Sequence, residues 1–164
     1  TRPDVDAARI GCFGSSGGGL ATLYTAAIDE RIAAAIVSSS PQELPALPPR
    51  FYRDMWAESG AGIHPDPSRP ASSVATCALT IPRPLWIIDG VRDECVWDPA
   101  DPNADAVFAA WHVQADQARA AIARYYEVAG VRDRFDATWF DAGHVGGMNL
   151  GNVSRWFRKW LPIP

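Results

Sequence analysis

"RIGCFGSSGGGLATLY", residues 9–24, is the stretch that decides the fold of this chain. A short apolar run ends at Gly14, and Leu20, Leu23 and Tyr24 then follow at helical spacing. The stretch therefore predicts a strand, a glycine-rich turn and a helix in immediate succession. Because two serines lie in the turn, the chemistry of the turn decides what the protein does.

Three more strands are predicted along the chain. Residues 32–38 form an apolar run without alternation, as expected for a parallel strand covered on both faces, and residues 83–90 and 135–143 predict two further strands. The strongest helical pattern spans residues 103–131, and residues 152–161 form a last amphipathic helix. This alternation predicts an α/β fold with a mostly parallel sheet and flanking helices.

Size and charge limit the chain to one domain without nucleic-acid-binding character. Its 164 residues, of which 48% are hydrophobic, suffice for one packed core over residues 1–164. The formal net charge of -4 provides no basic surface for a nucleic acid. No apolar stretch approaches the roughly 20 residues that cross a bilayer. We expect a soluble protein with no membrane partner, in a compartment that the sequence does not specify.

The cysteines give no sign of a structural role. Cys12, Cys77 and Cys95 lie far apart in the sequence and are odd in number. This pattern argues against a disulfide framework and against a metal site of the CxxC type, because both need cysteines in paired positions. We therefore expect three reduced thiols and no bound metal ion.

We weigh three functional interpretations of this glycine-rich turn, beside a purely structural turn with an inert serine. A phosphate-binding loop of the Walker type needs a lysine after its last glycine, where this chain continues with "GGL". A dinucleotide-binding turn needs the spacing G-x-G-x-x-G, whereas Gly11, Gly14 and Gly17 are each three residues apart. The third function, a nucleophile elbow of pattern G-x-S-x-G, fits residues 14–18 with Ser16 at the centre.

The elbow pattern has a physical reason. A serine on a strained strand-to-helix turn projects its hydroxyl from the sheet only if the residues two before and two after it are nearly free of side chains, here Gly14 and Gly18. Ser15 does not fit, because a phenylalanine would stand at the first of these positions. The helix begins beside Ser16, so we expect the Gly17 N–H to face a developing oxyanion.

A serine nucleophile needs a base and an orienting acid, each of which follows a strand of the sheet. Asp93 comes just after the third predicted strand, and His144 comes just after the fourth. The other histidines lack such a position, since His64 lies in a proline-rich loop and His112 lies within a helical pattern. Ser16, Asp93 and His144 are therefore the predicted catalytic residues.

Other acids near Asp93 and His144 leave the choice of the orienting acid open. Asp89 is expected inside the third strand, and Glu94 would serve only if the turn were one residue longer. Asp141 lies near the end of the fourth strand, where it would hold the His144 loop by hydrogen bonding. We favour Asp93, because the acid in this arrangement follows the strand before that of the histidine.

Three segments resemble the α/β-hydrolases, in particular the acetyl xylan esterase and dienelactone hydrolase-like branches. Residues 2–39 resemble their elbow region, residues 83–96 their acid-bearing turn, and residues 140–147 their histidine loop. The resemblance covers essentially the whole chain, as the C-terminal part of that fold, and implies a serine nucleophile, an aspartate acid and a histidine base at the three positions above. Two features depart from the pattern: the segment after Asp93 is longer, and nothing resembles the upstream oxyanion loop.

The predicted activity is hydrolysis of a carboxylic ester through an acyl-enzyme, with a small acyl group on a carbohydrate or similar alcohol as the specific case. The reaction needs no metal ion or organic cofactor. Alternatives are a peptidase of the prolyl oligopeptidase type, which has the same three residues in the same order, and a non-catalytic module that binds an anion. Trp56 and Trp97 are candidates for stacking on a sugar, or else are core residues.

The resemblance also implies that a neighbour of the first strand is missing. In the α/β-hydrolase order that strand is central, with one neighbour from upstream sequence and one from residues 32–38. Without the upstream neighbour, residues 9–13 would form an edge, and the loop that donates the second oxyanion N–H would be absent. We expect the chain to need an upstream half or another chain, and to be poorly stable and nearly inactive alone, since one lost donor costs about 10²- to 10³-fold in turnover.

Overall fold

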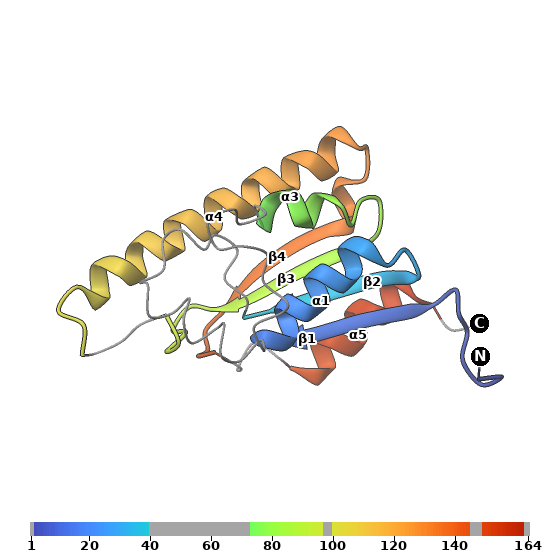
Figure 1. Ribbon diagram of the computed structural model, residues 1–164, viewed down its shortest axis with the longest axis horizontal. Helices are drawn as coiled ribbons and strands as arrows, with labels where there is room; N and C mark the ends of the chain where they lie inside the picture. Colours follow the sequence, from blue (N-terminus) through green and yellow to red (C-terminus); the bar gives the residue numbers. More distant parts are fainter. Residues whose placement is uncertain (1, 40–72, 97–99, 145–148, 163–164) are drawn as a thin grey trace.

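The computed structural model describes residues 2–39, 73–96, 100–144 and 149–162. Within them, four parallel strands form one sheet in the order β1-β2-β3-β4 (Figure 1). All three pairings are parallel, which confirms the predicted α/β class. The strands are β1 (Ile10–Ser15), β2 (Ile32–Ser38), β3 (Leu85–Gly90) and β4 (Phe135–Phe140).

Helices cover both faces of the sheet. On one face lie α1 (Gly17–Ile28), α3 (Ser73–Ala78) and the long α4 (Ala104–Val128), and on the other lies α5 (Leu150–Trp160) (Figure 1). A 3-10 turn, η2 (Arg132–Arg134), leads into β4. The two faces hold separate apolar clusters, so the sheet is the middle of three layers.

The central strands show why their sequences are apolar without alternation. Ile36 of β2 belongs to the apolar cluster between the sheet and α5. Val37 beside it belongs to the cluster on the other face, between the sheet and α1, α3 and α4. In β3, Ile87 and Ile88 divide in the same way, and neither is more than 1% exposed. Both faces are covered, so the successive residues Ala34–Val37 of β2 and Leu85–Ile88 of β3 are all apolar.

Strand β1 differs from β2 and β3 in its surroundings. It pairs with β2, and on its other side no strand of the described residues pairs with it. None of its side chains belongs to the fully buried set, although Cys12 and Phe13 pack against the two clusters. The expectation that another segment completes the sheet here stays a prediction.

Element boundaries follow local chemistry. β3 begins at Leu85 rather than residue 83, directly after Pro84, which has no N–H for the ladder. α4 ends at Val128, and Gly130 after it has φ +73°, the left-handed conformation that favours glycine. Prolines between the second and third predicted strands rule out one long helix there and leave short helices expected near residues 51–58 and 72–78. The second of these is present as α3. The one expected near residues 51–58 lies outside the described residues.

No disulfide joins the three cysteines, all of which lie in the described ranges. In the same part of the chain, no helix combines the length and the apolar character that crossing a bilayer requires. The parallel sheet gathers the carboxyl ends of its four strands at one edge, which is where ligands bind in open α/β folds. Ser16 comes directly after β1, and Asp93 and His144 lie in the loops that follow β3 and β4 at this edge.

Candidate active site

Ser16 lies between the last residue of β1 and the first residue of α1, with φ 57° and ψ -125°. A positive φ in a residue other than glycine costs of order 1 to 3 kcal/mol and persists only where the surroundings enforce it. Here the Ser16 N–H donates to the Ser38 carbonyl at 2.9 Å, and the Leu20 N–H donates to the Ser16 carbonyl at 3.1 Å. The last β1–β2 contact and the first turn of α1 thus hold the strained conformation.

The neighbouring serine lies differently. The Oγ of Ser15 is buried and has no hydrogen-bond partner among the described residues. A hydroxyl enclosed in this way is not available to a substrate. Of the two serines in the turn, Ser16 alone has the conformation expected of an elbow nucleophile.

The two glycines that frame Ser16 have unequal roles. A Cβ on Gly14 would overlap the carbonyl oxygen of Gly18, so the close approach of strand and helix requires glycine at position 14. A Cβ on Gly18 would meet no atom of the described residues within 4 Å, and the same holds for Gly17. The expectation that Gly18 must also lack a side chain is therefore wrong: its carbonyl, not its Cα, makes the close contact.

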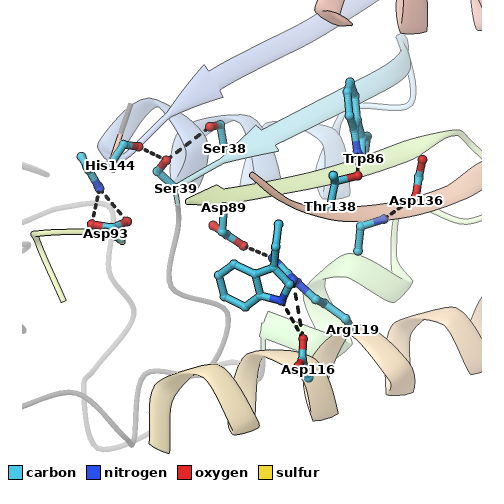
Figure 2. Close-up of polar contacts among 12 residues, drawn as sticks. Ser38, Ser39, Trp86, Asp89, Asp93, Asp116, Arg119, Asp136, Thr138 and His144 are labelled. Carbon is cyan, nitrogen blue, oxygen red and sulfur yellow. Dashed lines mark hydrogen bonds and ion pairs between the residues drawn. The ribbon is translucent and has the colours of Figure 1, made fainter. Parts of the chain in front are cut away.

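Asp93 and His144 face each other across the carboxyl edge of the sheet (Figure 2). The His144 Nδ1 lies 2.9 Å from Oδ1 and 2.8 Å from Oδ2 of Asp93. The Asp93 side chain is 3% exposed and that of His144 is 15% exposed. The Cys95 N–H also donates to Asp93 Oδ1 at 2.9 Å, and this hydrogen bond fixes the carboxylate within the turn that follows β3.

Two of the three other acids considered for this position, Asp141 and Glu94, have partners other than the imidazole ring. Asp141 forms an exposed ion pair with Arg92. Glu94 accepts a hydrogen bond from the backbone N–H of His144 at 2.8 Å, and its pKa is lowered by its own backbone N–H and then by that of His144. Among the acids weighed from the sequence, Asp93 is the one at the imidazole ring, while Asp141 and Glu94 brace the loops around it.

Solved structures similar to this chain share its arrangement of sheet and helices. Comparison with protein-family models and with curated protein sequences finds no match. A methylesterase, BT1017, superposes with a TM-score of 0.61 at 21% identity over 96% of this chain, and a glucuronoyl esterase of carbohydrate esterase family 15 from Caldicellulosiruptor kristjansonii with 0.65 at 20% over 98%. The acylaminoacyl peptidase of Pyrococcus horikoshii superposes with 0.57 at 16% over 97%.

This chain has the α/β-hydrolase fold. It spans 30%, 45% and 25% of the lengths of the three proteins, in the order given. At these identities the likeness concerns the fold, and the roles of individual residues have to be argued from their own geometry.

In this α/β-hydrolase fold, the acid turn and the histidine loop are joined by their backbones. The Val91 N–H donates to the Phe140 carbonyl at 2.9 Å, and the Arg92 N–H donates to the Ala142 carbonyl at 3.0 Å. A Cβ on Gly90 would overlap the Gly143 carbonyl, so the end of β3 needs glycine to let the loop approach. These contacts position Asp93 against His144.

Ser39 is a further contributor to the site that the sequence did not reveal. It follows β2 with φ 49°, and its N–H donates to the Ile88 carbonyl at 2.8 Å. Its Oγ donates to the backbone carbonyl of His144 and lies 3.3 Å from Ser38 Oγ (Figure 2). The signal was the run of serines at the end of β2, but only the fold shows which loop they reach.

A buried ion pair lies beneath the acid turn. Asp89 of β3 is 2% exposed, and its Oδ2 accepts a hydrogen bond from Arg119 Nη2 of α4 at 2.6 Å (Figure 2). The Arg119 guanidinium also lies 3.7 Å from the centre of the Trp139 ring of β4. Burial raises the pKa of the Asp89 carboxyl to about 6, against the lowering effect of Arg119. The pair ties α4 to the strand ends that carry the two loops.

His112 packs among aromatic rings. It stacks on Trp139 at a centroid distance of 4.6 Å and lies 4.5 Å from Phe108. Burial lowers its pKa, which keeps the imidazole neutral inside this cluster. His112 lies within α4, as its helical sequence pattern predicted, and the sequence set it aside as a base for that reason.

Several predicted site features stay predictions. The hydrogen bond between Ser16 Oγ and His144, and the role of the Gly17 N–H at the start of α1, are carried forward as such. Trp56, Trp97 and His64 lie outside the described residues.

Proposed function

We propose that the chain carries the catalytic residues of a serine hydrolase that cleaves carboxylic esters. The observation that carries the proposal is the hydrogen bond between the buried Asp93 carboxylate and Nδ1 of His144. It fixes the neutral imidazole with its proton on Nδ1, which leaves Nε2 able to accept a proton. The elbow places Ser16 at the same edge of the sheet, after β1.

The reaction follows from these roles. Ser16 Oγ attacks the ester carbonyl while its proton passes to His144 Nε2, and Asp93 stabilises the imidazolium that forms. The Gly17 N–H, backed by the dipole of α1, binds the oxyanion. The imidazolium then gives its proton to the departing alcohol, and water hydrolyses the acyl-enzyme by the same route in reverse.

The substrate class is proposed as an ester, with an acetyl group on a carbohydrate as the specific case. Two of the structures with this fold are named as a methylesterase and a glucuronoyl esterase, and a third as an acylaminoacyl peptidase. A peptidase is therefore the second candidate. Trp56 and Trp97 are proposed to stack on the sugar of the preferred substrate.

The deciding experiment is labelling with a fluorophosphonate probe followed by mapping of the adduct. We expect a single adduct on Ser16, and none in the Ser16→Ala variant. Ser15→Ala is the matched control, because its hydroxyl is buried, and it should keep the adduct. An adduct on any residue other than Ser16 contradicts the proposal. No adduct in folded protein also contradicts it and favours a non-catalytic binding module.

The substrate class is tested separately. Turnover of a chromogenic acetyl ester is compared with that of an aminoacyl amide, in wild type and in Ser16→Ala. Faster turnover of the ester supports the esterase, and faster turnover of the amide supports the peptidase. Loss of either activity by several orders of magnitude in Ser16→Ala ties it to the triad.

A further inference from the structure

Asp93 and His144 have a third neighbour with metal-binding chemistry, the thiol of Cys95. Each of the three side chains offers one ligand atom, and these atoms all lie within 4.8 Å of one another. Asp93 is buried, His144 is partly buried and Cys95 is exposed at the rim. The carboxylate and imidazole are thus held in place by the fold, while the Cys95 thiol is accessible to an ion from solvent.

The acid turn explains why Cys95 stays beside the pair. Its backbone N–H donates to Asp93 Oδ1 at 2.9 Å, and the Val96 N–H donates to the Asp93 carbonyl at 3.1 Å. These two hydrogen bonds fold the backbone from Asp93 to Val96 into a turn, which keeps Cys95 next to the Asp93 carboxylate. Oδ2 of Asp93 faces Nδ1 of His144, so it is the oxygen placed to ligate an ion together with that nitrogen.

The distances suit a tetrahedral ion with little movement. Ligation by sulfur at about 2.3 Å and by nitrogen and oxygen at about 2.0 Å requires ligand atoms roughly 3.3 to 3.6 Å apart. The Nδ1 to Oδ2 distance of 2.8 Å must lengthen slightly, and the Cys95 sulfur lies within 4.8 Å of a ring nitrogen of His144 and of a carboxylate oxygen of Asp93. A thiolate, an imidazole and a carboxylate together are the donor set that Zn²⁺ prefers over Mg²⁺ or Ca²⁺.

We propose that Asp93, Cys95 and His144 bind one divalent cation of the zinc class, and that the bound ion switches off the hydrolase. The binding stands on the geometry alone, whereas the switching-off rests on the proposed function. The ion is an inhibitor and takes no part in the ester hydrolysis. A fourth position is left for water, as expected of three protein ligands.

Inhibition follows from the protons. When the ion binds, the Cys95 thiol loses its proton to solvent and its sulfur ligates as thiolate. The His144 imidazole stays neutral: its proton moves from Nδ1, where the ion binds, to Nε2. An imidazole protonated on Nε2 cannot accept the Ser16 proton, so the nucleophile is no longer activated.

The binding half is tested with Co²⁺, which replaces Zn²⁺ and gives a thiolate-to-metal absorption band. We expect metal-free wild type to develop this band with one equivalent of Co²⁺ and to lose it when Zn²⁺ is added. Cys95→Ser should lack the band. Cys12→Ser is the matched control, because Cys12 lies in β1 with its thiol next to Thr22, and it should keep the band. No band in wild type, or a band that survives in Cys95→Ser, overturns the proposal.

The inhibition half is measured as the rate of fluorophosphonate labelling of Ser16, with each variant compared with its own metal-free rate. In wild type, Zn²⁺ should lower the labelling rate at least about tenfold. Cys95→Ser should need at least about tenfold more Zn²⁺ for the same effect, because even the loss of a residue that only hydrogen-bonds to a metal ligand lowers metal affinity by about that factor. Equal sensitivity of both proteins overturns the switch. If metal-free Ser16 is not labelled at all, the proposed function fails, while the Co²⁺ band still decides the metal site.

Discussion

The elbow of residues 14–18 and the pair of Asp93 and His144 are built in opposite ways. The elbow consists of consecutive residues, and its constraint is steric, since β1 and α1 meet where Gly14 touches the Gly18 carbonyl. The acid–base pair joins residues 51 apart in the chain, and its constraint is polar, a set of hydrogen bonds between two loops. A local site is broken by an added methyl group, and a long-range site by a lost charge or hydrogen bond.

The largest effect should come from the polar side of this comparison, in Asp93→Asn. The amide cannot hold the imidazole proton on Nδ1 as the carboxylate does, so labelling of Ser16 should slow by about 10³- to 10⁴-fold. Asp141→Asn is the matched control, because Asp141 forms an exposed ion pair with Arg92, and the rate should change less than about twofold. Equal effects of the two substitutions would show that Asp93 is not the orienting acid.

The steric side is tested by Gly14→Ala. The new Cβ overlaps the Gly18 carbonyl, so strand and helix must separate, and unfolding in urea should show a loss of about 3 kcal/mol together with loss of labelling. Gly18→Ala adds the same methyl where no atom in the described part of the chain lies within 4 Å, and it should be neutral or stabilising by up to about 1 kcal/mol. Similar stability of the two variants contradicts the close contact at Gly14.

The buried carboxylate under the acid turn predicts a pH dependence of stability. The pKa of Asp89 is raised from 3.8 to about 6, chiefly by burial, so the folded state binds its proton more tightly than the unfolded state. Its contribution to the free energy of unfolding is therefore complete below pH about 4 and is lost as the pH rises to about 6. In Asp89→Asn that free energy should fall less across this window, by of order 1 to 3 kcal/mol. Parallel curves for the two proteins would contradict the raised pKa.

The smallest effect is expected at the hydrogen bond that braces the histidine loop. Glu94→Ala removes the acceptor of the His144 N–H and should slow labelling by up to about tenfold, which corresponds to one hydrogen bond of about 1 kcal/mol. Glu94→Gln keeps an oxygen acceptor and should restore most of the rate. If glutamine is as slow as alanine, the charge of Glu94 rather than its hydrogen bond supports the loop.

The sequence predicted those features whose cause lies within a few residues. The glycine-rich turn predicted β1, the strained Ser16 and α1, because only glycine at position 14 lets a strand and a helix meet so closely. The unbroken apolar runs of β2 and β3 predicted strands that are covered on both faces of the sheet. The one local error, at Gly18, arose because spacing shows which residues lack side chains but not which atoms make the contact.

The tertiary structure decided which distant groups meet. Asp93, Glu94 and Asp141 are all carboxylates that follow β3 or β4, and the sequence ranked them only by their place after a strand. The register of β3 and β4 gave each a different partner. The serines at the end of β2 did not show that Ser39 reaches His144, and no local signal linked Asp89 to Arg119. Each pair joins segments that only the sheet and its helices bring together. Steric constraints within a turn depend on consecutive residues and can be predicted from them. Hydrogen bonds between loops depend on a fold that the whole chain determines.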